Sequence, residues 1–359
     1  MMRELTVSLG KRSYPIMIQN GLLQNCAEQL NKVCQAPRRV ILVTDDTVAA
    51  LYEATVTEAL QAGGYAVKAV RLAPGEGSKT LESIARLYAE AFAFSMTRSD
   101  VVVALGGGVV GDVAGFFAAT LFRGVPFVQI PTTLLAQVDS SVGGKTGVNV
   151  PEGKNLVGSF YQPRLVLIDP TVLGSLTDSD FANGMAEVIK YGCICDAELF
   201  RQLSQAGSRA AMDAILPAVI ATCCDAKRKV VEADELDTGS RMLLNFGHTM
   251  GHVIEKGYGF KTYTHGKAVA IGMVLAARLG ERTGKTEAGT AEKIEAILRQ
   301  FHLPTEAALP DGWDTTMLLD KKMQNGLLHC VLLHKIGEGF VEKTKAEAFI
   351  QAIQALSKP

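Results

Sequence analysis

Residues 100–120 read DVVVALGGGVVGDVAGFFAAT, and this stretch decides the fold class. Its first part, 100–105, is a continuous apolar run of the kind that forms a strand buried on both faces of a parallel sheet. Gly106, Gly108 and Gly111 follow with GxGxxG spacing, ahead of a helical pattern. The sequence therefore predicts a strand–turn–helix unit whose backbone N–H groups face a phosphate or pyrophosphate, and a turn that serves packing alone is the alternative.

Similar short apolar runs flank this unit along the first 175 residues. They alternate with helical patterns, which predicts a doubly wound, mainly parallel sheet with right-handed crossovers. The further strands that we expect are 39–44, 65–72, 126–131 and 164–169. We therefore expect an N-terminal, Rossmann-like α/β domain over residues 1–175.

The pattern changes after residue 131. Residues 132–160 form a polar, glycine-rich stretch, which we expect to be a long functional loop. Helical patterns then dominate, at 178–206, 210–235, 241–257, 266–284 and 289–301, before an expected hairpin and a closing amphipathic helix at 344–356. The sequence thus predicts a second, mainly α-helical domain over residues 176–359.

The composition is that of a globular protein without a strong charge. The 359 residues include 36 basic and 37 acidic side chains, a formal net charge of -1, so no global field favours nucleic acid or an anionic membrane. Asp112 and Arg123 interrupt the apolar runs before these reach the roughly 20 residues of a membrane span. The N-terminal segment lacks a signal-peptide core, and seven cysteines without a CxxC pair indicate a reducing compartment, so we expect a cytoplasmic protein.

Cationic and amide side chains gather in and beside the polar stretch 132–160. The residues concerned, with one carboxylate among them, are Arg123, Asp139, Lys145, Lys154 and Asn155. Convergent cations in a glycine-rich segment are what a phosphorylated or carboxylated small substrate requires. A solvated surface loop is the alternative.

Three residues nearer the N-terminus have two interpretations each. Glu76 and Lys79 of PGEGSKT, at i and i+3, face one ligand in the first interpretation and water in the second. The acid that normally follows a Rossmann glycine turn by about 20 residues is missing, since the next carboxylate after the turn segment is Asp139. Asp45, at the end of an earlier strand, is the better acceptor for ribose hydroxyls, and a helix N-cap is its other possible role.

Three of the six histidines lie between positions 248 and 265. His248 and His252, at i and i+4, share one face of a helix, and His265 lies at the expected start of the next helix. Glu187 and Lys190 share a helical face upstream. Imidazole and carboxylate together suit Zn²⁺ or a similar divalent ion with an open position for substrate, and spacing alone favours His248 and His252 as the ligand pair.

Two further groups of polar residues lie in the predicted helices. Lys227 belongs to a basic run that reads equally well as a charged helical face. Arg241 and Asn245, at i and i+4, point to the neighbourhood of His248 if one helix holds all three.

Several segments, taken together, resemble one protein family. They occur in one order along the chain and read GGGVVGDVAGF, LFRGV, IPTTLLAQVDSSVGGKTGVN, GKNLVGSFYQP, GMAEVIKYG, DTGSRMLLNFGHTMGH and THGKAVAIGM. The chain resembles the 3-dehydroquinate synthases, which act second in the shikimate pathway to chorismate and the aromatic amino acids. The resemblance implies a homodimer, an N-terminal NAD-binding α/β domain, a mainly α-helical C-terminal domain and an active-site cleft between the domains.

The resemblance also implies roles for individual residues. It assigns a divalent metal, zinc or cobalt, to Glu187, His248 and His265, and proton transfer to His252. The residues that it assigns to NAD are Asp45, Glu76, Lys79, Gly107, Gly108, Val109, Val110, Gly111, Asp112, Thr132, Thr133, Lys145, Lys154, Val172, Leu173, Gly174 and Ser175. Those that it assigns to substrate are Asp139, Lys145, Asn155, Lys190, Lys227, Arg241, Asn245, one of Lys321 and Lys322, and Arg123 from the other subunit at the phosphate.

The implied reaction is a phosphate elimination followed by ring closure. The metal polarises the alcohol of 3-deoxy-D-arabino-heptulosonate 7-phosphate that NAD oxidises, phosphate leaves, the hydride returns, and an aldol step closes the ring of 3-dehydroquinate. Another sugar phosphate cyclase, of inosose or valiolone type, and a polyol or glycerol phosphate dehydrogenase are the alternatives. The chain departs from the family pattern at Asp237, where glutamate is usual, which puts the acid/base role of that position in question.

Overall fold

The computed structural model describes residues 2–34, 38–237, 239–318, 323–324 and 327–356. It divides into two compact units, of which the first comprises Met1–Thr177 with Cys223–Leu236 and the second Asp178–Thr222 with Asp237–Pro359. The break after Thr177 lies close to the boundary expected at 175, whereas Cys223–Leu236, expected in the second domain, belongs to the first unit. In the parts of the chain that the structure describes, no helix has the length and apolar character needed to cross a bilayer.

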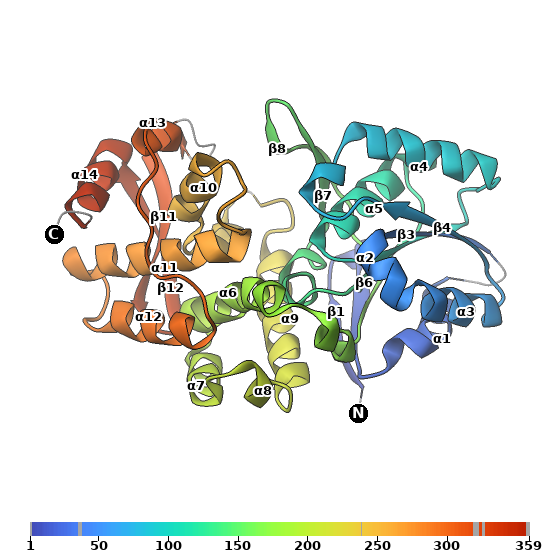
Figure 1. The fold of residues 1–359 in the computed structure, drawn as a ribbon, viewed down its shortest axis with the longest axis horizontal. Helices are drawn as coiled ribbons and strands as arrows, with labels where there is room; N and C mark the ends of the chain where they lie inside the picture. Colours follow the sequence, from blue (N-terminus) through green and yellow to red (C-terminus); the bar gives the residue numbers. More distant parts are fainter. Residues whose placement is uncertain (1, 35–37, 238, 319–322, 325–326, 357–359) are drawn as a thin grey trace. The chain divides into compact units, whose positions relative to one another are not determined.

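A seven-stranded sheet forms the centre of the first unit (Figure 1). Its order is β1–β2–β9–β6–β5–β3–β4, and every pair except β1 with β2 is parallel. The strands are β1 (Arg3–Val7), β2 (Tyr14–Ile18), β3 (Arg39–Asp45), β4 (Ala66–Leu72), β5 (Val101–Gly106), β6 (Phe127–Pro131) and β9 (Leu165–Ile168). The five strands expected from the sequence and their parallel pairing are thus confirmed, while β1 and β2 extend the sheet beyond the prediction.

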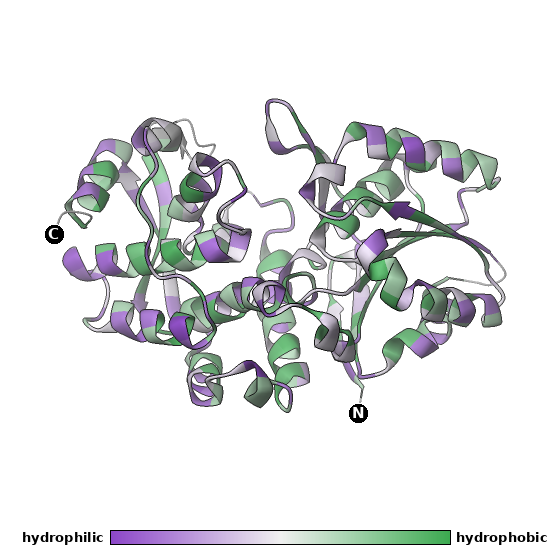
Figure 2. Ribbon diagram, viewed as in Figure 1, coloured by the Kyte–Doolittle hydropathy of each residue, from purple (hydrophilic) through white to green (hydrophobic). Residues whose placement is uncertain are grey.

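Helices cover both faces of this sheet because successive side chains of a strand point to opposite sides. Val40 and Leu42 of β3 join the core beneath α1 (Cys26–Val33) and α3 (Ala54–Ala62). Ile41 and Val43 join the core beneath α4 (Leu81–Ala93) and α5 (Gly108–Thr120). The strands are largely green in Figure 2, whereas α3 and α4 also carry purple residues. Burying each such aliphatic side chain stabilises the fold by about 1.5–3 kcal/mol.

The polar stretch 132–160 differs from the long loop that we expected. It contains a π-helical turn, η6 (Ala136–Ser140), and an antiparallel hairpin of β7 (Lys145–Val150) and β8 (Gly153–Phe160). Gly147 and Gly158 face each other across the hairpin, and a Cβ at Gly158 would lie 2.1 Å from the Thr146 carbonyl oxygen. The glycines that suggested a loop therefore allow two strands to approach closely.

The second unit is mainly helical, as expected, with a small antiparallel sheet at its C-terminal end. Expected helix 178–206 is two helices, because Asp196 caps the second through the Leu199 N–H at 2.8 Å. Expected helix 241–257 is also two elements, since Gly247 has a φ of 78°. The elements are α6 (Asp178–Cys195), α7 (Ala197–Ala206), α8 (Arg209–Met212), α9 (Leu216–Ala233), η8 (Ser240–Asn245), α10 (His248–Gly257), α11 (His265–Arg282), α12 (Thr290–Gln300), α13 (Trp313–Leu318), β10 (Met323–Gln324), β11 (Leu327–Lys335), β12 (Glu338–Lys345) and α14 (Ala346–Leu356).

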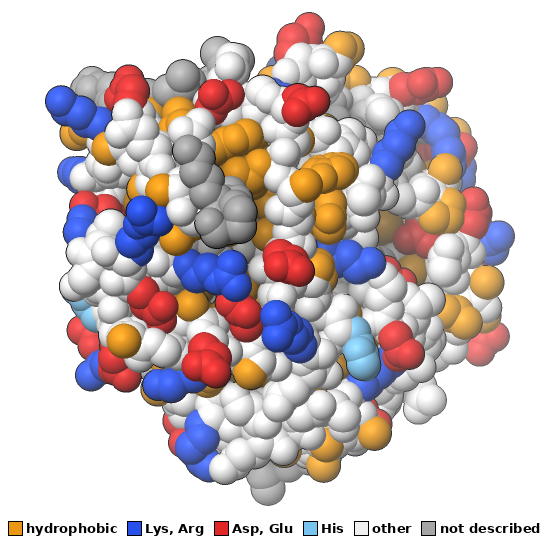
Figure 3. Space-filling view, turned by 60° about the vertical axis from the view of Figure 1, so that its left-hand side comes forward, with side chains coloured by type: hydrophobic (Ala, Val, Ile, Leu, Met, Phe, Trp, Pro, Cys, Tyr) orange, Lys and Arg blue, Asp and Glu red, His pale blue; other side chains and the backbone are white. Residues whose placement is uncertain are grey.

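Charged side chains of both signs are interspersed on the surface. On the face shown in Figure 3, lysines and arginines lie beside acidic residues, without a broad area of one sign. Ion pairs such as the exposed Arg201 with Glu198, and Lys285 with the half-buried Glu342, also bring opposite charges together at the surface. This distribution agrees with the near-zero net charge and gives that face no cationic surface for nucleic acid.

Candidate active site

Glu187, His248 and His265 come together from three helices of the second unit. Glu187 lies within α6, whereas His248 and His265 are the first residues of α10 and α11. The Nε2 atoms of His248 and His265 lie 3.6 and 3.4 Å from Glu187 Oε1. His252 lies one turn further along α10, and its ring centroid is 5.5 Å from that of His248. The structure therefore assembles the three residues that the family resemblance implied, with His252 beside them.

Two glycines allow these helices to meet. A Cβ at Gly266 would lie 2.2 Å from the Asn183 carbonyl oxygen of α6, and the Gly266 N–H donates to Asn183 Oδ1 at 2.7 Å. A Cβ at Gly272 of α11 would lie 1.9 Å from the Gly247 carbonyl oxygen, just before α10. The residues that flank the histidines in sequence thus hold the ends of α10 and α11 against each other and against the helix that carries Glu187.

Both histidines have a partner for their second ring nitrogen. His248 Nδ1 lies 3.0 Å from the Phe246 carbonyl oxygen, and His265 Nδ1 lies 3.5 Å from Glu255 Oε2. With a proton held on each Nδ1, each Nε2 could offer its lone pair to an ion bound beside Glu187. Sequence reasoning missed Glu255 and the Phe246 carbonyl, although Glu255 lies only three residues after His252.

The charges around Glu187 favour its ionised form. Burial alone would raise the pKa of Glu187, but Lys190, whose ammonium lies against the carboxylate, and the two histidines outweigh it and hold this pKa well below the usual range. Burial is also the largest influence on His248 and lowers its pKa well below the usual value. Burial would lower the pKa of His265 as well, but its contacts with Glu187 and Glu255 raise that pKa to about 10.

These three side chains fit a divalent metal ion. Two ligands that each lie about 2.0–2.1 Å from a tetrahedral zinc ion are about 3.3–3.4 Å apart, and the two Nε2–Oε1 separations are 3.6 and 3.4 Å. Both carboxylate oxygens of Glu187 are buried, with the Lys190 ammonium against Oε2 and the two histidine Nε2 atoms facing Oε1. A buried, ionised carboxylate whose Oε1 atom faces two imidazole nitrogens at these distances is a donor set that suits a divalent ion.

The glycine turn of the first unit has the predicted strand–turn–helix setting. Strand β5 ends at Gly106 and α5 begins at Gly108, with no described side chain capping its first N–H groups. A Cβ at Gly107 would lie 3.1 Å from the Thr133 side chain, and a Cβ at Gly108 would lie 3.1 Å from Ser140 Oγ. Gly107 and Gly108 are half-buried, so the turn has little room for side chains of its own, and the uncapped N–H groups at the start of α5 suit an anionic ligand.

Contacts with α5 and β7 hold the segment around Glu76 and Lys79 in place. Lys79 is buried and forms an ion pair with Asp112 of α5. Burial raises the pKa of Asp112, and Lys79 opposes that change. Glu76 Oε1 accepts a hydrogen bond from Asn149 Nδ2 at 2.8 Å, and the Asn149 N–H donates to the Lys79 carbonyl oxygen at 2.8 Å. The solvated-turn interpretation is therefore wrong for Lys79, and Asn149 of β7 is a residue that sequence reasoning missed.

The other residues assigned to NAD lie near the carboxyl ends of the parallel strands, where ligands of open α/β sheets bind. Asp45, at the end of β3, accepts a hydrogen bond from the Val48 N–H at 2.9 Å, so its N-cap role is confirmed. Thr132 and Thr133 follow β6, and the Thr132 N–H donates to the Gly106 carbonyl oxygen at 3.0 Å. The segment 172–175 belongs to η7 (Pro170–Ser175) after β9, while Lys154 lies on β8.

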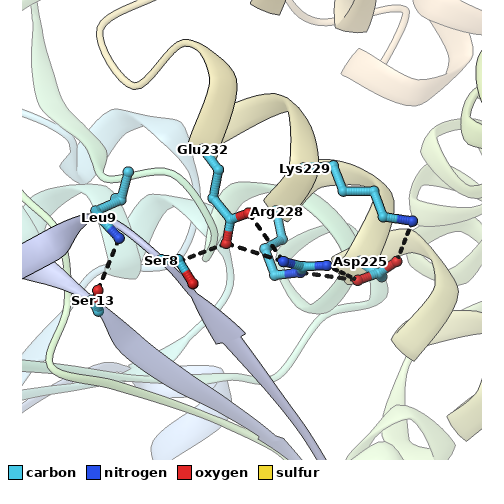
Figure 4. A network of polar contacts seen from close by, with 7 residues as sticks. All are labelled: Ser8, Leu9, Ser13, Asp225, Arg228, Lys229 and Glu232. Carbon is cyan, nitrogen blue, oxygen red and sulfur yellow. Dashed lines mark hydrogen bonds and ion pairs between the residues drawn. The ribbon is translucent and has the colours of Figure 1, made fainter.

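Lys227 contacts a different part of the first unit from its basic neighbours on the same helix. It is buried, it donates to the main-chain oxygen of Asp139 at 2.6 Å, and its Nζ lies 3.0 Å from Asp139 Oδ1. Arg228 instead pairs with Asp225 and Glu232 of its own helix, and Glu232 accepts from the Ser8 N–H at 2.6 Å (Figure 4). The charged-face interpretation thus holds for Arg228 and is wrong for Lys227.

The residues assigned to substrate are divided between the units. Arg123, Asp139, Lys145, Asn155 and Lys227 belong to the first unit, and Lys190, Asp237, Arg241 and Asn245 to the second. Arg241 and Asn245 lie on η8, so the single helix that would have joined them to His248 is not formed. Arg123 is exposed with a φ of 66°, and Asn155 and Asp237 have φ values of 55° and 57°. Lys321 and Lys322 lie outside the described residues.

The fold and these two groups of residues define a class of two-unit α/β enzyme that combines a dinucleotide-type glycine turn with a carboxylate–histidine metal group. Family models for the N-terminal and C-terminal parts of 3-dehydroquinate synthase match residues 69–183 and 184–323. A 3-dehydroquinate synthase from Clostridium beijerinckii is 49% identical over 350 residues, which cover 97% of this chain and 100% of the relative. The chain belongs to the 3-dehydroquinate synthase family.

Solved structures of related enzymes share the fold. A 2-epi-5-epi-valiolone synthase from Streptomyces hygroscopicus subsp. jinggangensis with NAD+ and Zn2+ bound is 28% identical, with a TM-score of 0.87 and 98% of each chain covered. A 2-deoxy-scyllo-inosose synthase complexed with carbaglucose-6-phosphate, NAD+ and Co2+ is 25% identical, also with a TM-score of 0.87, and the match covers 98% of this chain and 100% of the other. The expected α/β fold class is thereby confirmed.

Proposed function

We propose that this chain is a lyase that converts 3-deoxy-D-arabino-heptulosonate 7-phosphate to 3-dehydroquinate and phosphate. Its family membership supports this activity over nearly the full length of the chain. The observation that carries it is the group of Glu187, His248 and His265, whose two Nε2 atoms lie 3.6 and 3.4 Å from one carboxylate oxygen. Because all seven cysteines are thiols, we place the enzyme in the cytoplasm.

The cofactors are NAD and a divalent ion, zinc or cobalt, as in the related cyclases. When bound, the ion would supply Lewis-acid polarisation of a substrate hydroxyl, and NAD would supply a reversible hydride acceptor for a reaction that is redox-neutral overall. Glu187, His248 and His265 would hold the ion. The start of α5 would bind the pyrophosphate of NAD, with Lys79 and Asp112 beside it. Asp45 has a second carboxylate oxygen for ribose hydroxyls, since only Oδ1 caps the helix.

The substrate is an anion at both ends, and we assign its charges to cationic side chains of this chain. Lys227 is fixed by Asp139 and presents a positioned ammonium. Arg241 is a buried guanidinium on η8 that suits a carboxylate, because its planar fork forms two parallel hydrogen bonds. His252 is exposed beside the metal group, so we assign to its imidazole the transfer of a substrate proton.

We also propose that the enzyme is a homodimer in which Arg123 serves the active site of the other subunit. Arg123 is exposed on a stretch where Phe122, Arg123 and Gly124 have φ values of 50°, 66° and 119°. Such a strained backbone is retained where its surroundings fix it, and it is typical of functional positions. Co-expression of Arg123→Ala with Lys190→Met tests this assignment, because mixed dimers would regain one intact site and part of the activity. Two inactive variants that stay inactive together would contradict it.

The function itself is tested by one assay with two readouts. The purified protein is incubated with the heptulosonate phosphate and trace NAD, with and without a chelator, while phosphate release and NADH absorbance are recorded together. We expect chelator-sensitive phosphate release over many turnovers without net NADH. Phosphate release only from hexose or heptose phosphates would indicate a cyclase of inosose or valiolone type. Steady accumulation of NADH would indicate a simple dehydrogenase.

A further inference from the structure

We propose that Glu255 is a positioning residue that orients the His265 imidazole toward the metal group. It would do so without binding the ion or the substrate itself. The inference rests on the proposed function only in that it requires the metal group of Glu187, His248 and His265. It concerns a side chain that is nearly buried in the last turn of α10, far along the helix from His248.

The His265 ring lies between two carboxylates. Its Nε2 atom is 3.4 Å from Glu187 Oε1, and its Nδ1 atom is 3.5 Å from Glu255 Oε2. The two ring nitrogens are therefore aimed at different acids, one on α6 and one on α10. A carboxylate opposite Nδ1 holds the proton on that nitrogen, so that the lone pair remains on Nε2, where an ion would bind.

Among the described residues, the partners of the His265 ring nitrogens are these two carboxylates. His265 is the first residue of α11, and Thr264 before it makes no side-chain cap. The Nδ1 atom of His248 has a partner that is close in sequence, because the carbonyl oxygen of Phe246, two residues earlier, lies 3.0 Å from it. No described main-chain carbonyl is paired in this way with His265. Glu255 thus orients the His265 ring through Nδ1, as the Phe246 carbonyl oxygen orients the His248 ring. The carboxylate of Glu255 differs from that carbonyl in carrying a full negative charge.

Glu255 is better placed as an orienting group than as a ligand. His252, Glu255 and His265 also lie near one another, so a second arrangement of ligands can be drawn around Glu255. In that arrangement His265 would offer Nδ1, and the Nε2 atoms of His248 and His265 that face the buried Oε1 of Glu187 would not be used. Glu187 is also more deeply buried than Glu255, at 1% against 9% exposed, so its charge is the more costly to leave unsatisfied. The ion is therefore assigned to Glu187, and Glu255 is assigned to the Nδ1 atom of His265.

The test is a metal-binding measurement on the intact chain. Glu255→Gln keeps the shape of the side chain and removes its charge, and Glu255→Asp keeps the charge with a shorter reach. Lys256→Gln is the matched control, because Lys256 is the next residue of α10 and is exposed. Zinc affinity is measured by competition with a chromophoric chelator, and the geometry of bound Co2+ by its visible absorption spectrum. The thermal unfolding midpoint of each metal-free protein reports on folding.

We expect Glu255→Gln to bind zinc about 10–100-fold more weakly, which is the usual effect of losing an outer partner of a metal-bound histidine. We also expect an altered Co2+ spectrum, partial recovery of both properties in Glu255→Asp, and no change in Lys256→Gln. Equal zinc affinity and equal spectra in Glu255→Gln and the unchanged protein would overturn the proposal. Complete loss of zinc binding in Glu255→Gln with the metal-free fold intact would also overturn it, because Glu255 would then be a ligand. If the unchanged protein itself held no metal, the proposed metal group and this inference would both fail.

Discussion

The ammonium of Lys190 lies against the carboxylate of Glu187, one helical turn away on α6, and their side chains are only 2% and 1% exposed. In the metal-free protein this lysine supplies the positive charge that keeps Glu187 ionised in a buried setting. A divalent ion at Glu187 would add two further charges close to the same ammonium. The buried pair therefore stabilises the empty group of ligands and opposes the ion at the same time.

Lys190→Met is expected to destabilise the metal-free protein and to increase the stabilisation that metal provides. Removing one partner of a buried ion pair costs about 3–5 kcal/mol, because the other charge is left unpaired. Thermal unfolding with and without zinc measures both effects. Arg201→Met is the matched control, because Arg201 pairs with Glu198 at the same i,i+3 spacing while both side chains are more than half exposed, at 55% and 56%. An exposed pair of this kind contributes at most about 1 kcal/mol. An unchanged midpoint in Lys190→Met would contradict the prediction.

Glu187→Gln is expected to abolish metal retention. The amide keeps the size of the side chain but removes the charge that pairs with the ion, and it leaves Lys190 without its buried partner. Metal content after gel filtration of the purified variant measures the effect, with Glu198→Gln on α7 as an exposed control. Full metal occupancy in Glu187→Gln would show that the ligands lie elsewhere.

Asp237→Glu is expected to keep catalytic activity and to lose some stability. Glutamate is the usual residue of the family here, but this backbone has a φ of 57°, which aspartate tolerates better than most residues. We expect a cost of about 1 kcal/mol in the free energy of unfolding, measured by denaturant titration, with kcat retained. Asp237→Gly separates the two effects, since glycine accepts the backbone and lacks the carboxylate. A large loss of kcat in Asp237→Glu would mean that the site uses the shorter side chain.

Only one of the seven thiols is expected to react rapidly with a disulfide reagent in the folded protein. Cys195 is exposed, whereas the others are buried. Burial raises the pKa of Cys26 to about 11 and that of Cys224 to about 12. At pH 8 about one in a thousand Cys26 side chains would be the reactive thiolate, and this fraction rises tenfold with each pH unit up to the pKa. Titration of the native protein at pH 8 should show a single fast phase that Cys195→Ser removes, and several fast thiols would contradict the burial.

The central sheet could be predicted because most of its strands can be recognised from the local sequence alone. Residues 39–45 and 101–106 are continuous apolar runs, since both faces of each strand are covered by helices. Strands β1 and β2 escaped prediction because RELTV is mostly exposed and lacks an apolar run, and because the two strands pair antiparallel with each other, outside the strand–helix alternation that indicated the others. The hairpin of β7 and β8 escaped because its glycines read as loop residues, while their effect, a close approach of two backbones, depends on the partner strand.

The metal group could be predicted only in part. The i,i+4 spacing correctly placed His248 and His252 on one helix, but it could not rank them against His265, which comes from a different helix. That ranking depends on the direction in which each Nε2 points relative to Glu187, and no spacing encodes it. The family resemblance instead named Glu187, His248 and His265, the three residues that the structure brings together. Glu255 and Asn149 were missed for the same reason, because their partners are distant in sequence.

The return of Cys223–Leu236 to the first unit has a consequence for how this protein is made and how it can be divided. The first unit lacks its last piece until the ribosome has added Leu236, so its folding overlaps in time with synthesis of the second unit. A fragment that ends at Thr177 would be missing Lys227 opposite Asp139 and the contact of Glu232 with Ser8. Recombination at a single point in the gene could not exchange the first unit whole, so the two units are expected to be inherited together.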